Sequence, residues 1–593
     1  MVDRTTKLRW RRRFRRSQKH VETFGAQAEE DLEQYFFRRL NRLGGVRRFA
    51  IGWVLLVVVL ITGVVVQTRA LSKYYLSLQP APGGVFTEGI TGSFTNANPL
   101  YASGSVDSAV SELVFSGLMK YDANNKLVGD LAQKITTDGR ASTFTVVLRP
   151  GLKWQDGHPL TAEDVVFTYK TIQNPDAKSP LFSNWQNVKI EAKDPQTVVF
   201  TLPHGLVSFP NSLTNGIVPK HLLSNIPATQ LRSIAFNTAS PIGSGPFKWE
   251  TVEVQGDTPD TREERVGLVP NPTYHLGVPK LARFTIRAFH DQGQMLESFR
   301  KQELSAMAGL ESMPDDLAKN PDIVEYNVPL TGEVMVFLKN TDPILQNQKV
   351  REALTRATNQ QEILAGLGYP VIPANSPFLK SHIGYNKNIS QLEYNVNDAK
   401  RLLDEAGWKV GPDGMRYKDG KPLTFRLYSQ SNSQYAYVTQ VLQRQWRAIG
   451  VDAQVMLQPE SDLESTIAFH NYDALLYGVS LGPDPDVFAY WHSTQADPRS
   501  ANRLNLSEYK SNVADQSLEG GRARVDANLR VIKYKSFLEA WRNDAPAIAL
   551  YQPRFLYVSQ DTIYNFHPKV FNSPTDRYSN VQNWMTREER QSD

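Results

Sequence analysis

The chain contains no cysteine among its 593 residues. That absence excludes disulfides, thiolate metal ligands, cysteine nucleophiles and lipid attachment through cysteine. It leaves the compartment open, because a large domain can fold without disulfides on either side of a membrane. The length predicts two to four domains, since one hydrophobic core stops growing well below this size.

A basic excess is missing from most of the chain. The net charge of +5 is unevenly spread, because residues 1–48 hold 14 Lys+Arg and 6 Asp+Glu, a net of +8. The remainder is slightly acidic, with a net charge of −3. Nucleic-acid binding by this larger part therefore has little support.

Motifs of nucleophilic, metal-dependent and phosphate chemistry are absent as well. The sequence has no G-x-S-x-G, H-E-x-x-H or Walker A motif. The glycine-rich GSGP of Gly243–Pro246 lacks the Lys-Ser/Thr of a phosphate loop, and we predict a tight turn at a domain crossing. His158, His470 and His492 have no metal-ligand spacing. We therefore predict no metal, no cofactor and no enzyme activity.

One long apolar run is present, FAIGWVLLVVVLITGVVV of Phe49–Val66, without a charge. As a helix it would reach about 27 Å, enough for a hydrocarbon core. Basic residues cluster before it, so the positive-inside rule places residues 1–48 in the cytoplasm and the chain after about residue 70 outside. We predict an uncleaved single-pass anchor in the cell membrane. A cleaved signal peptide is the alternative, which the long preceding segment disfavours.

The segments that flank this run have simpler predictions. Ala28–Leu43 (AEEDLEQYFFRRLNRL) is typical of an amphipathic helix whose basic residues contact membrane lipid. A solvated helix that only sets topology is an equal alternative. Residues 67–84, which end in QPAPGG, are predicted to form a linker.

The rest of the chain alternates strand and helix patterns. Residues 142–150 and 196–203 show the period-two, β-branched pattern of half-buried strands. Helices are predicted over 395–407 and 436–450, both ending on glycine. Asn359, three residues before Glu362, predicts the start of another helix. The fold class is therefore mixed, α/β or α+β.

Residues 151–171, GLKWQDGHPLTAEDVVFTYKT, resemble a catalytic cluster at first sight. Four side chains of types used in acid/base and metal sites lie close together: Asp156, His158, Glu163 and Asp164. Asp156 falls in a turn, however, and Thr161 with Asp164 has the spacing of a capped helix start. We predict that the stretch is structural and carries no chemistry.

The same stretch belongs to a longer segment, Leu113–Tyr169, that resembles the signature region of the extracellular solute-binding proteins of family 5. These are the oligopeptide-, dipeptide- and nickel-binding components of ATP-driven importers. Further matches follow in the family's order, and the resemblance covers roughly residues 84–585. They lie at 241–249 (PIGSGPFKW), 271–287, 337–364, 394–408 (YNVNDAKRLLDEAGW), 440–455 and 543–558.

The resemblance implies a two-lobed periplasmic-binding-protein clamp with an extra inserted domain, behind one N-terminal transmembrane helix. One lobe would combine about 85–115, 240–322 and 536–593. The inserted domain would span about 116–239, and the other lobe about 323–535. The implied partners are two permease subunits and, through them, cytoplasmic ATPases.

The resemblance also indicates a ligand-facing segment, YDALLYGVSLGPDPDVFAYWHS of Tyr472–Ser493. In peptide-binding relatives an Asp shortly before the DPD-like motif receives the peptide's α-amino group. Ser480 or Leu481 aligns there and neither is acidic, so capture of free peptide N-termini is in doubt. Asp484 or Asp486 could substitute, or both could be turn residues.

Other candidate ligand residues are aromatic or polar. Four aromatic residues could stack on a sugar or cover a peptide side chain, although any one of them could be core: Trp185, Tyr477, Tyr490 and Trp491. By the resemblance, Asn96 would lie where the first strand meets the cleft.

Three classes of function follow from these observations. The leading prediction is a membrane-tethered receptor of an ABC importer that captures peptides by lobe closure, with a receptor for oligosaccharides or other small solutes as its variant. A ligand sensor that signals through the basic cytoplasmic segment is the second class. An anchored hydrolase is the third, and it has no supporting motif.

Overall fold

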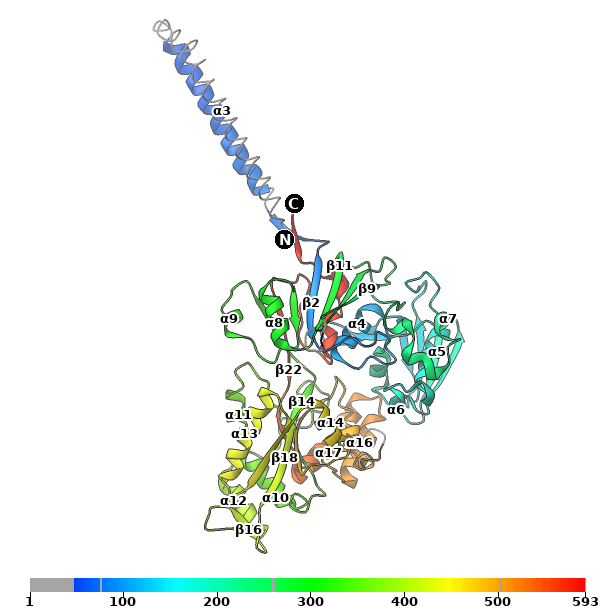
Figure 1. The fold of residues 1–593 in the computed structure, drawn as a ribbon, viewed down its shortest axis with the longest axis vertical. Coiled ribbons are helices and arrows are strands. Elements are labelled where there is room, and N and C mark those ends of the chain that lie inside the picture. The colour runs from blue at the N-terminus through cyan, green and yellow to red at the C-terminus, as the bar shows by residue number, and fades with distance from the viewer. Residues whose placement is uncertain (1–46, 75–76, 257, 259–261, 501–503, 592–593) are drawn as a thin grey trace. The chain divides into compact units, whose positions relative to one another are not determined.

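The computed structural model describes residues 47–74, 77–256, 258, 262–500 and 504–591 (Figure 1). Contacts divide the chain into two units, which are described separately. The first combines Met1–Gln79 with Glu588–Asp593, and the second is Pro80–Arg587. The predicted basic segment and the amphipathic helix of Ala28–Leu43 lie outside the described residues.

The first unit is dominated by helix α3 (Arg47–Tyr74), which continues past the predicted end of the apolar run. Strands β1 (Ser77–Ala81) and β23 (Arg587–Gln591) form a two-stranded sheet. The predicted linker at 67–84 is therefore wrong in both halves. Gln67–Tyr74 contains no glycine or proline that would end the helix, and residues 77–81 are paired as a strand. Within the residues that the structure describes, Ile51–Ala70 is the one helical stretch long and apolar enough to cross a membrane.

The second unit contains two large sheets, and we call the parts built on them lobe I and lobe II. The lobe I sheet has seven strands, in the order β13-β22-β12-β2-β11-β10-β9. Strand β2 pairs in parallel with β11 and β12, and the other pairings are antiparallel. The bounds are β2 (Val85–Thr91), β9 (Phe247–Gln255), β10 (Glu263–Pro270), β11 (Arg283–Phe289), β12 (Ala306–Ala308), β13 (Val324–Pro329) and β22 (Arg554–Ser559).

A third sheet has four antiparallel strands, in the order β5-β6-β8-β7, and we call the part built on it, residues 116–239, the inserted domain. The two predicted strands are confirmed as β6 (Thr143–Leu148) and β8 (Thr197–Thr201), which pair with each other. Their buried side chains alternate as the period-two pattern indicated. Their apolar core is continuous with that of lobe I. The other two strands are β5 (Ala132–Thr137) and β7 (Lys189–Asp194), and the α-helices of this part are α5 (Ala162–Ile172), α6 (Phe182–Trp185) and α7 (Lys220–Leu223).

Lobe II has a five-stranded sheet, in the order β19-β18-β20-β14-β21, with helices on both faces (Figure 1). Every residue of β14 is buried, and alternate side chains enter two separate cores. Such two-sided burial explains its uninterrupted apolar run, VMVFL. The bounds are β14 (Gly332–Leu338), β18 (Thr424–Gln430), β19 (Asp452–Gln458), β20 (Ala474–Ser480), β21 (Ala547–Tyr551), α10 (Gln348–Ala357), α12 (Val396–Glu405), α13 (Ser433–Arg447), α14 (Glu460–Ala468), α16 (Asn512–Arg522) and α17 (Ala527–Asp544).

The predicted helices are present, with the caps that the sequence indicated. The Asn395 side chain accepts the Asp398 N–H at 3.0 Å, and Gly407 beyond the end of α12 has a φ of +88°. Asn359 accepts the Glu362 N–H at 3.3 Å at the start of α11 (Gln360–Ala365). Local capping chemistry therefore fixed these boundaries.

Two chain crossings join the lobes, one from β13 to β14 and one from β21 to β22. They lie side by side, because the Leu330 N–H donates to the Pro553 carbonyl at 2.9 Å. Sheet membership moves the expected lobe boundaries from 322/323 and 535/536 to these crossings. Strand β13 pairs along its whole length with β22 of lobe I, whereas β21 pairs with β14 of lobe II.

The stretch at 151–171 folds as predicted around helix α5. Thr161 is the N-cap, and the Asp164 carboxylate accepts the Thr161 N–H at 2.9 Å in a capping box. The same carboxylate accepts the Lys220 N–H at 2.9 Å and so also holds the start of α7. Asp164 therefore ties two helices together, a role that local sequence could not reveal.

Loss of the N-cap gives the first testable expectation. Thr161→Ala should lower the free energy of unfolding by about 1 kcal/mol, because the α5 start loses a capping side chain. Urea unfolding of the unit that begins at residue 80 measures this, with Thr229→Ala at an exposed position of the same domain as the control. Ligand affinity should not change. A large loss of affinity at normal stability would instead give this stretch a binding role.

Candidate ligand-binding site

A hollow of about 470 Å³ lies in lobe I at the carboxyl ends of parallel strands β2 and β12. In open α/β sheets, this edge is where ligands bind. We call it the β2–β12 hollow. Its lining is rich in hydroxyl groups and includes Thr91, Ser103, Ser105, Ser108, Ser573, Thr575 and the two arginines Arg554 and Arg577.

The hollow borders lobe II through Arg554. Its guanidinium lies over the ring of Tyr369, 3.6 Å from the ring centre, so one wall residue of lobe I contacts lobe II. Burial lowers the pKa of Arg554, with Tyr369 and Glu325 acting in the opposite direction. A second contact between the lobes joins the Ser433 hydroxyl to the Glu311 carboxylate at 3.0 Å.

The inserted domain also contacts lobe II. The Val207 N–H donates to the Arg522 carbonyl at 3.0 Å, and the Ser208 hydroxyl donates to Asp486 at 3.0 Å. Away from the two chain crossings, these contacts with lobe II are individual hydrogen bonds and one cation–π contact. Contacts of this kind can break and re-form when one lobe moves against the other.

Three of the predicted ligand residues lie together at the carboxyl end of β20. The Tyr490 hydroxyl donates to the Ser480 carbonyl at 2.5 Å. Burial, with Tyr477 nearby, raises the pKa of Tyr490 to about 12, so the hydroxyl is a neutral donor at pH 7. Ser480 is exposed and Tyr477 is half-buried. The structure therefore brings Tyr477, Ser480 and Tyr490 together at a strand end.

The other two aromatic candidates are buried in apolar cores, as the alternative of a core role allowed. Trp185 is 2% exposed and stacks on Tyr169 inside the inserted domain, with 4.0 Å between ring centres. Trp491 is 1% exposed and stacks on Phe337 in lobe II. Asn96 is also buried, and its side chain accepts the Asn98 N–H at 2.8 Å to hold a turn.

Both candidate carboxylates are already paired with arginine. Asp484 forms a bidentate ion pair with Arg530, with distances of 2.8 and 2.6 Å. Asp486 pairs with Arg522 at 2.9 Å and also accepts the Ser208 hydroxyl. These arginines lie 36 to 46 positions further along the chain, so the sequence did not reveal them. These ion pairs support the alternative that Asp484 and Asp486 are structural turn residues rather than ligand contacts.

Sequence reasoning missed the lobe I side of the site. Thr91, Arg554 and Thr575 carry no motif, and only the sheet order brings them to one edge. One usable signal existed: a polar residue at the carboxyl end of a buried parallel strand is a candidate for ligand contact. Thr91 satisfies that rule at the end of β2.

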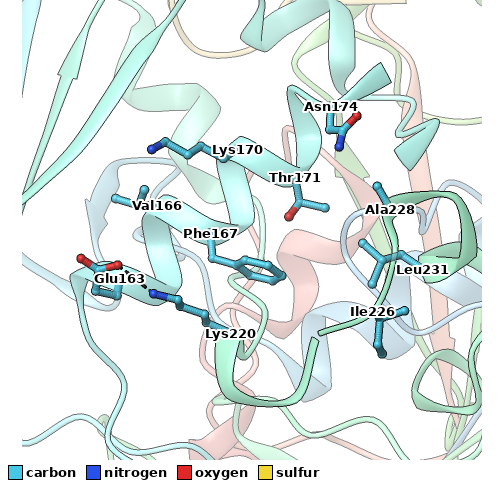
Figure 2. A pocket seen from close by; sticks show the side chains of 10 residues that line it. All are labelled: Glu163, Val166, Phe167, Lys170, Thr171, Asn174, Lys220, Ile226, Ala228 and Leu231. Carbon is cyan, nitrogen blue, oxygen red and sulfur yellow. Dashed lines mark hydrogen bonds and ion pairs between the residues drawn. The ribbon is translucent and has the colours of Figure 1, made fainter. Parts of the chain in front are cut away.

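A second hollow, of about 430 Å³, lies entirely within residues 163–231 of the inserted domain (Figure 2). Helix α5 forms one wall, and Ile226, Ala228 and Leu231 form the other. The Glu163–Lys220 ion pair, at 2.9 Å, lies at one end. Because all its lining residues belong to one domain, lobe closure would not enclose it.

Two lobes joined by paired crossings, with a polar hollow at the strand ends, define a periplasmic-type solute-binding protein. The family described as bacterial extracellular solute-binding proteins, family 5 Middle, matches residues 126–500, and the chain belongs to this family. Members of the family are transport receptors rather than enzymes, in agreement with the sequence-based prediction.

Individual relatives agree over most of the chain. The oligopeptide-binding protein AppA of Bacillus subtilis is 28% identical over 538 residues, which cover 85% of this chain and 92% of AppA. The structure of AppA in complex with a nonapeptide has a TM-score of 0.70 at 27% identity, covering 86% of this chain and 100% of that one. NikZ from Campylobacter jejuni in complex with Ni(L-His) has a TM-score of 0.72 at 25% identity, covering 85% and 99%.

Proposed function

We propose that the chain is the substrate-binding component of an ABC importer and that it captures peptides. The observation that carries this proposal is the polar hollow at the strand ends of lobe I, bordered by lobe II through Arg554 and Tyr369. The name of the relative AppA, an oligopeptide-binding protein, supports peptides as the ligand class. Backbone amides of a peptide match a lining of hydroxyl and guanidinium groups.

Capture would occur by closure of the lobes about their two crossings. Leu330–Thr331 and Gln552–Pro553 are the short connecting segments, and closure would bring the Tyr477–Ser480–Tyr490 group toward the hollow. The three-part division into lobe I, inserted domain and lobe II belongs to this proposal.

Helix α3 would tether the receptor to the cell membrane, with the large unit extracellular or periplasmic. Its apolar stretch Ile51–Ala70 is long enough to span the bilayer, and the basic residues before it set the orientation. A tether keeps the receptor near its permease subunits, which would pass ligand on at the expense of cytoplasmic ATPases. Lipid and these subunits are therefore the proposed partners.

The ligand class has one rival within the same fold. NikZ binds Ni(L-His), so a small chelate or another small solute is the alternative ligand. Native mass spectrometry of the unit from residue 80 onward, purified from its own host, tests the choice. A heterogeneous set of bound short peptides, with a smaller radius of gyration in solution scattering when saturated, is expected. A single bound mass that matches a sugar or chelate would retain the clamp and overturn the peptide assignment.

Peptide binding should be nearly insensitive to the peptide N-terminus. Because Asp484 and Asp486 are both paired with arginine, N-acetylation should change the Kd by less than about threefold. Calorimetry with free and acetylated forms of one peptide measures this. A loss of about 30-fold or more would mean that a carboxylate receives the ammonium group, since removing one partner of a buried charge pair is costly.

A further inference from the structure

The inserted domain carries on its surface two histidines and an aspartate from separate segments. The ligating atoms of Asp156, His158 and His221 all lie within 4.8 Å of one another. His221 Nε2 is 2.7 Å from Asp156 Oδ2, and His158 Nδ1 is 3.2 Å from Asp156 Oδ1. The two imidazole rings stack with 4.3 Å between their centres. We propose that these three side chains bind a divalent transition-metal ion of the zinc, nickel or copper class, against the sequence-based expectations of no metal site and of a purely structural role for residues 151–171.

The backbone holds Asp156 and His158 on a tight turn. The Trp154 N–H donates to the His158 carbonyl at 2.8 Å, and the Gly157 N–H donates to the Trp154 carbonyl at 2.9 Å. Gly157 has a φ of +93°, which glycine adopts without strain. The turn therefore fixes the backbone of both residues, so little backbone freedom remains to be lost on binding a metal ion.

Hydrogen bonds to the rest of the fold hold both segments of the cluster, the 154–158 turn and helix α7. The Gln155 side chain donates to the Phe247 carbonyl at 2.7 Å and accepts the Gly243 N–H at 3.1 Å, which ties the turn to lobe I. The α7 segment that carries His221 is held by Asp164 through the Lys220 N–H. A metal ion at this cluster would bridge two segments that the fold has already placed.

The donor set decides the class of ion. Two imidazole nitrogens and one carboxylate oxygen suit zinc, nickel and copper, whereas calcium and magnesium require oxygen ligands. Metal–ligand bonds of about 2.0–2.2 Å place tetrahedral donors roughly 3.3 Å apart. Rotation of the exposed His158 side chain supplies the remaining approach, and water would complete the coordination.

Charge and access favour an ion at this place. Lys220, next to His221, is paired with Glu163 at 2.9 Å, so its ammonium charge is balanced (Figure 2). The side chain of His158 is 61% exposed, which leaves an open path for a hydrated ion. The cluster shares no residue with the lining of the β2–β12 hollow, so this site does not depend on the transported solute.

Metal titration of the untagged full-length chain in detergent, after removal of metal by chelator, tests the site. Calorimetry with zinc chloride should give one zinc ion per chain with micromolar affinity. His221→Gln and His158→Gln should each weaken binding roughly tenfold or more. His204→Gln, at an exposed histidine of the same domain, is the matched control and should change nothing.

Electron paramagnetic resonance of the wild-type chain loaded with copper tests the site without any variant, so the result does not depend on whether a variant folds. Hyperfine coupling to two imidazole nitrogens, displaced by zinc, is expected. Zinc binding weaker than millimolar, or equal binding by wild type and the His158→Gln/His221→Gln double variant, would overturn the proposal. The Asp156–His221 hydrogen bond would then be purely structural.

Discussion

Arg577→Met is expected to destabilise the second unit by about 3–5 kcal/mol, because it leaves a buried carboxylate without its partner. Arg577 and Glu88 are 2% and 0% exposed and form a bidentate pair at 3.0 and 2.9 Å. The Tyr578 hydroxyl also donates to Glu88. Urea unfolding of the unit from residue 80 onward measures the loss.

A double variant distinguishes the effect of the lost ion pair from the effect of lost side-chain packing. Glu88→Gln/Arg577→Met removes both charges, so it should recover a substantial part of the loss. Arg300→Met breaks an exposed ion pair with Asp316 and should cost less than about 1 kcal/mol. Equal stability losses in the single and double variants would show that the Arg577 stem, rather than its charge, stabilises lobe I.

This pair also shows what the sequence could not predict. Glu88 lies on β2 and Arg577 lies 489 positions later, and only the seven-stranded sheet order brings them together. The same holds for Asp484 with Arg530, and for His221 with the 154–158 turn. Long-range charge partners leave no local pattern, so the sequence presents their members as free candidates for binding.

Local structure, in contrast, was predicted well wherever the residues that determine it lie within the same short segment. Strands β6 and β8 follow from period-two patterns, and α5 and α12 follow from their caps. The tryptophan candidates show the limit of local sequence. A tryptophan at a core position and one at a ligand site can have the same local sequence, and only the structure shows that Trp185 and Trp491 are buried.

The lobe boundaries fall between these two cases. Strand β13 was expected in lobe II, although its register pairs it with β22 of lobe I. Nothing within Val324–Pro329 specifies which sheet the strand joins, because pairing depends on the partner strand. The family resemblance predicted the order of the lobes along the chain, whereas their boundaries follow from which strands pair with each other.

Gly243→Ala is expected to lower the free energy of unfolding by about 3 kcal/mol, because the segment that passes from the inserted domain into lobe I has no room for a side chain at this position. A Cβ at this position would lie 1.9 Å from the Val114 carbonyl oxygen, a backbone atom that cannot rotate away. Gly139→Ala, which meets nothing within 4 Å, is the control and should stay within about 0.5 kcal/mol.

Thermal or urea unfolding measures this loss of stability. The same substitution should also disturb the neighbouring turn. The Gly243 N–H and carbonyl both bond to Gln155, at 3.1 and 2.9 Å, so a shifted backbone also detaches the 154–158 turn. Gly243→Ala should therefore weaken zinc binding at the Asp156–His158–His221 cluster as well as lower stability. Normal stability in Gly243→Ala would mean that the Val114 backbone moves aside at little cost and that the close approach at Gly243 does not hold this segment rigidly.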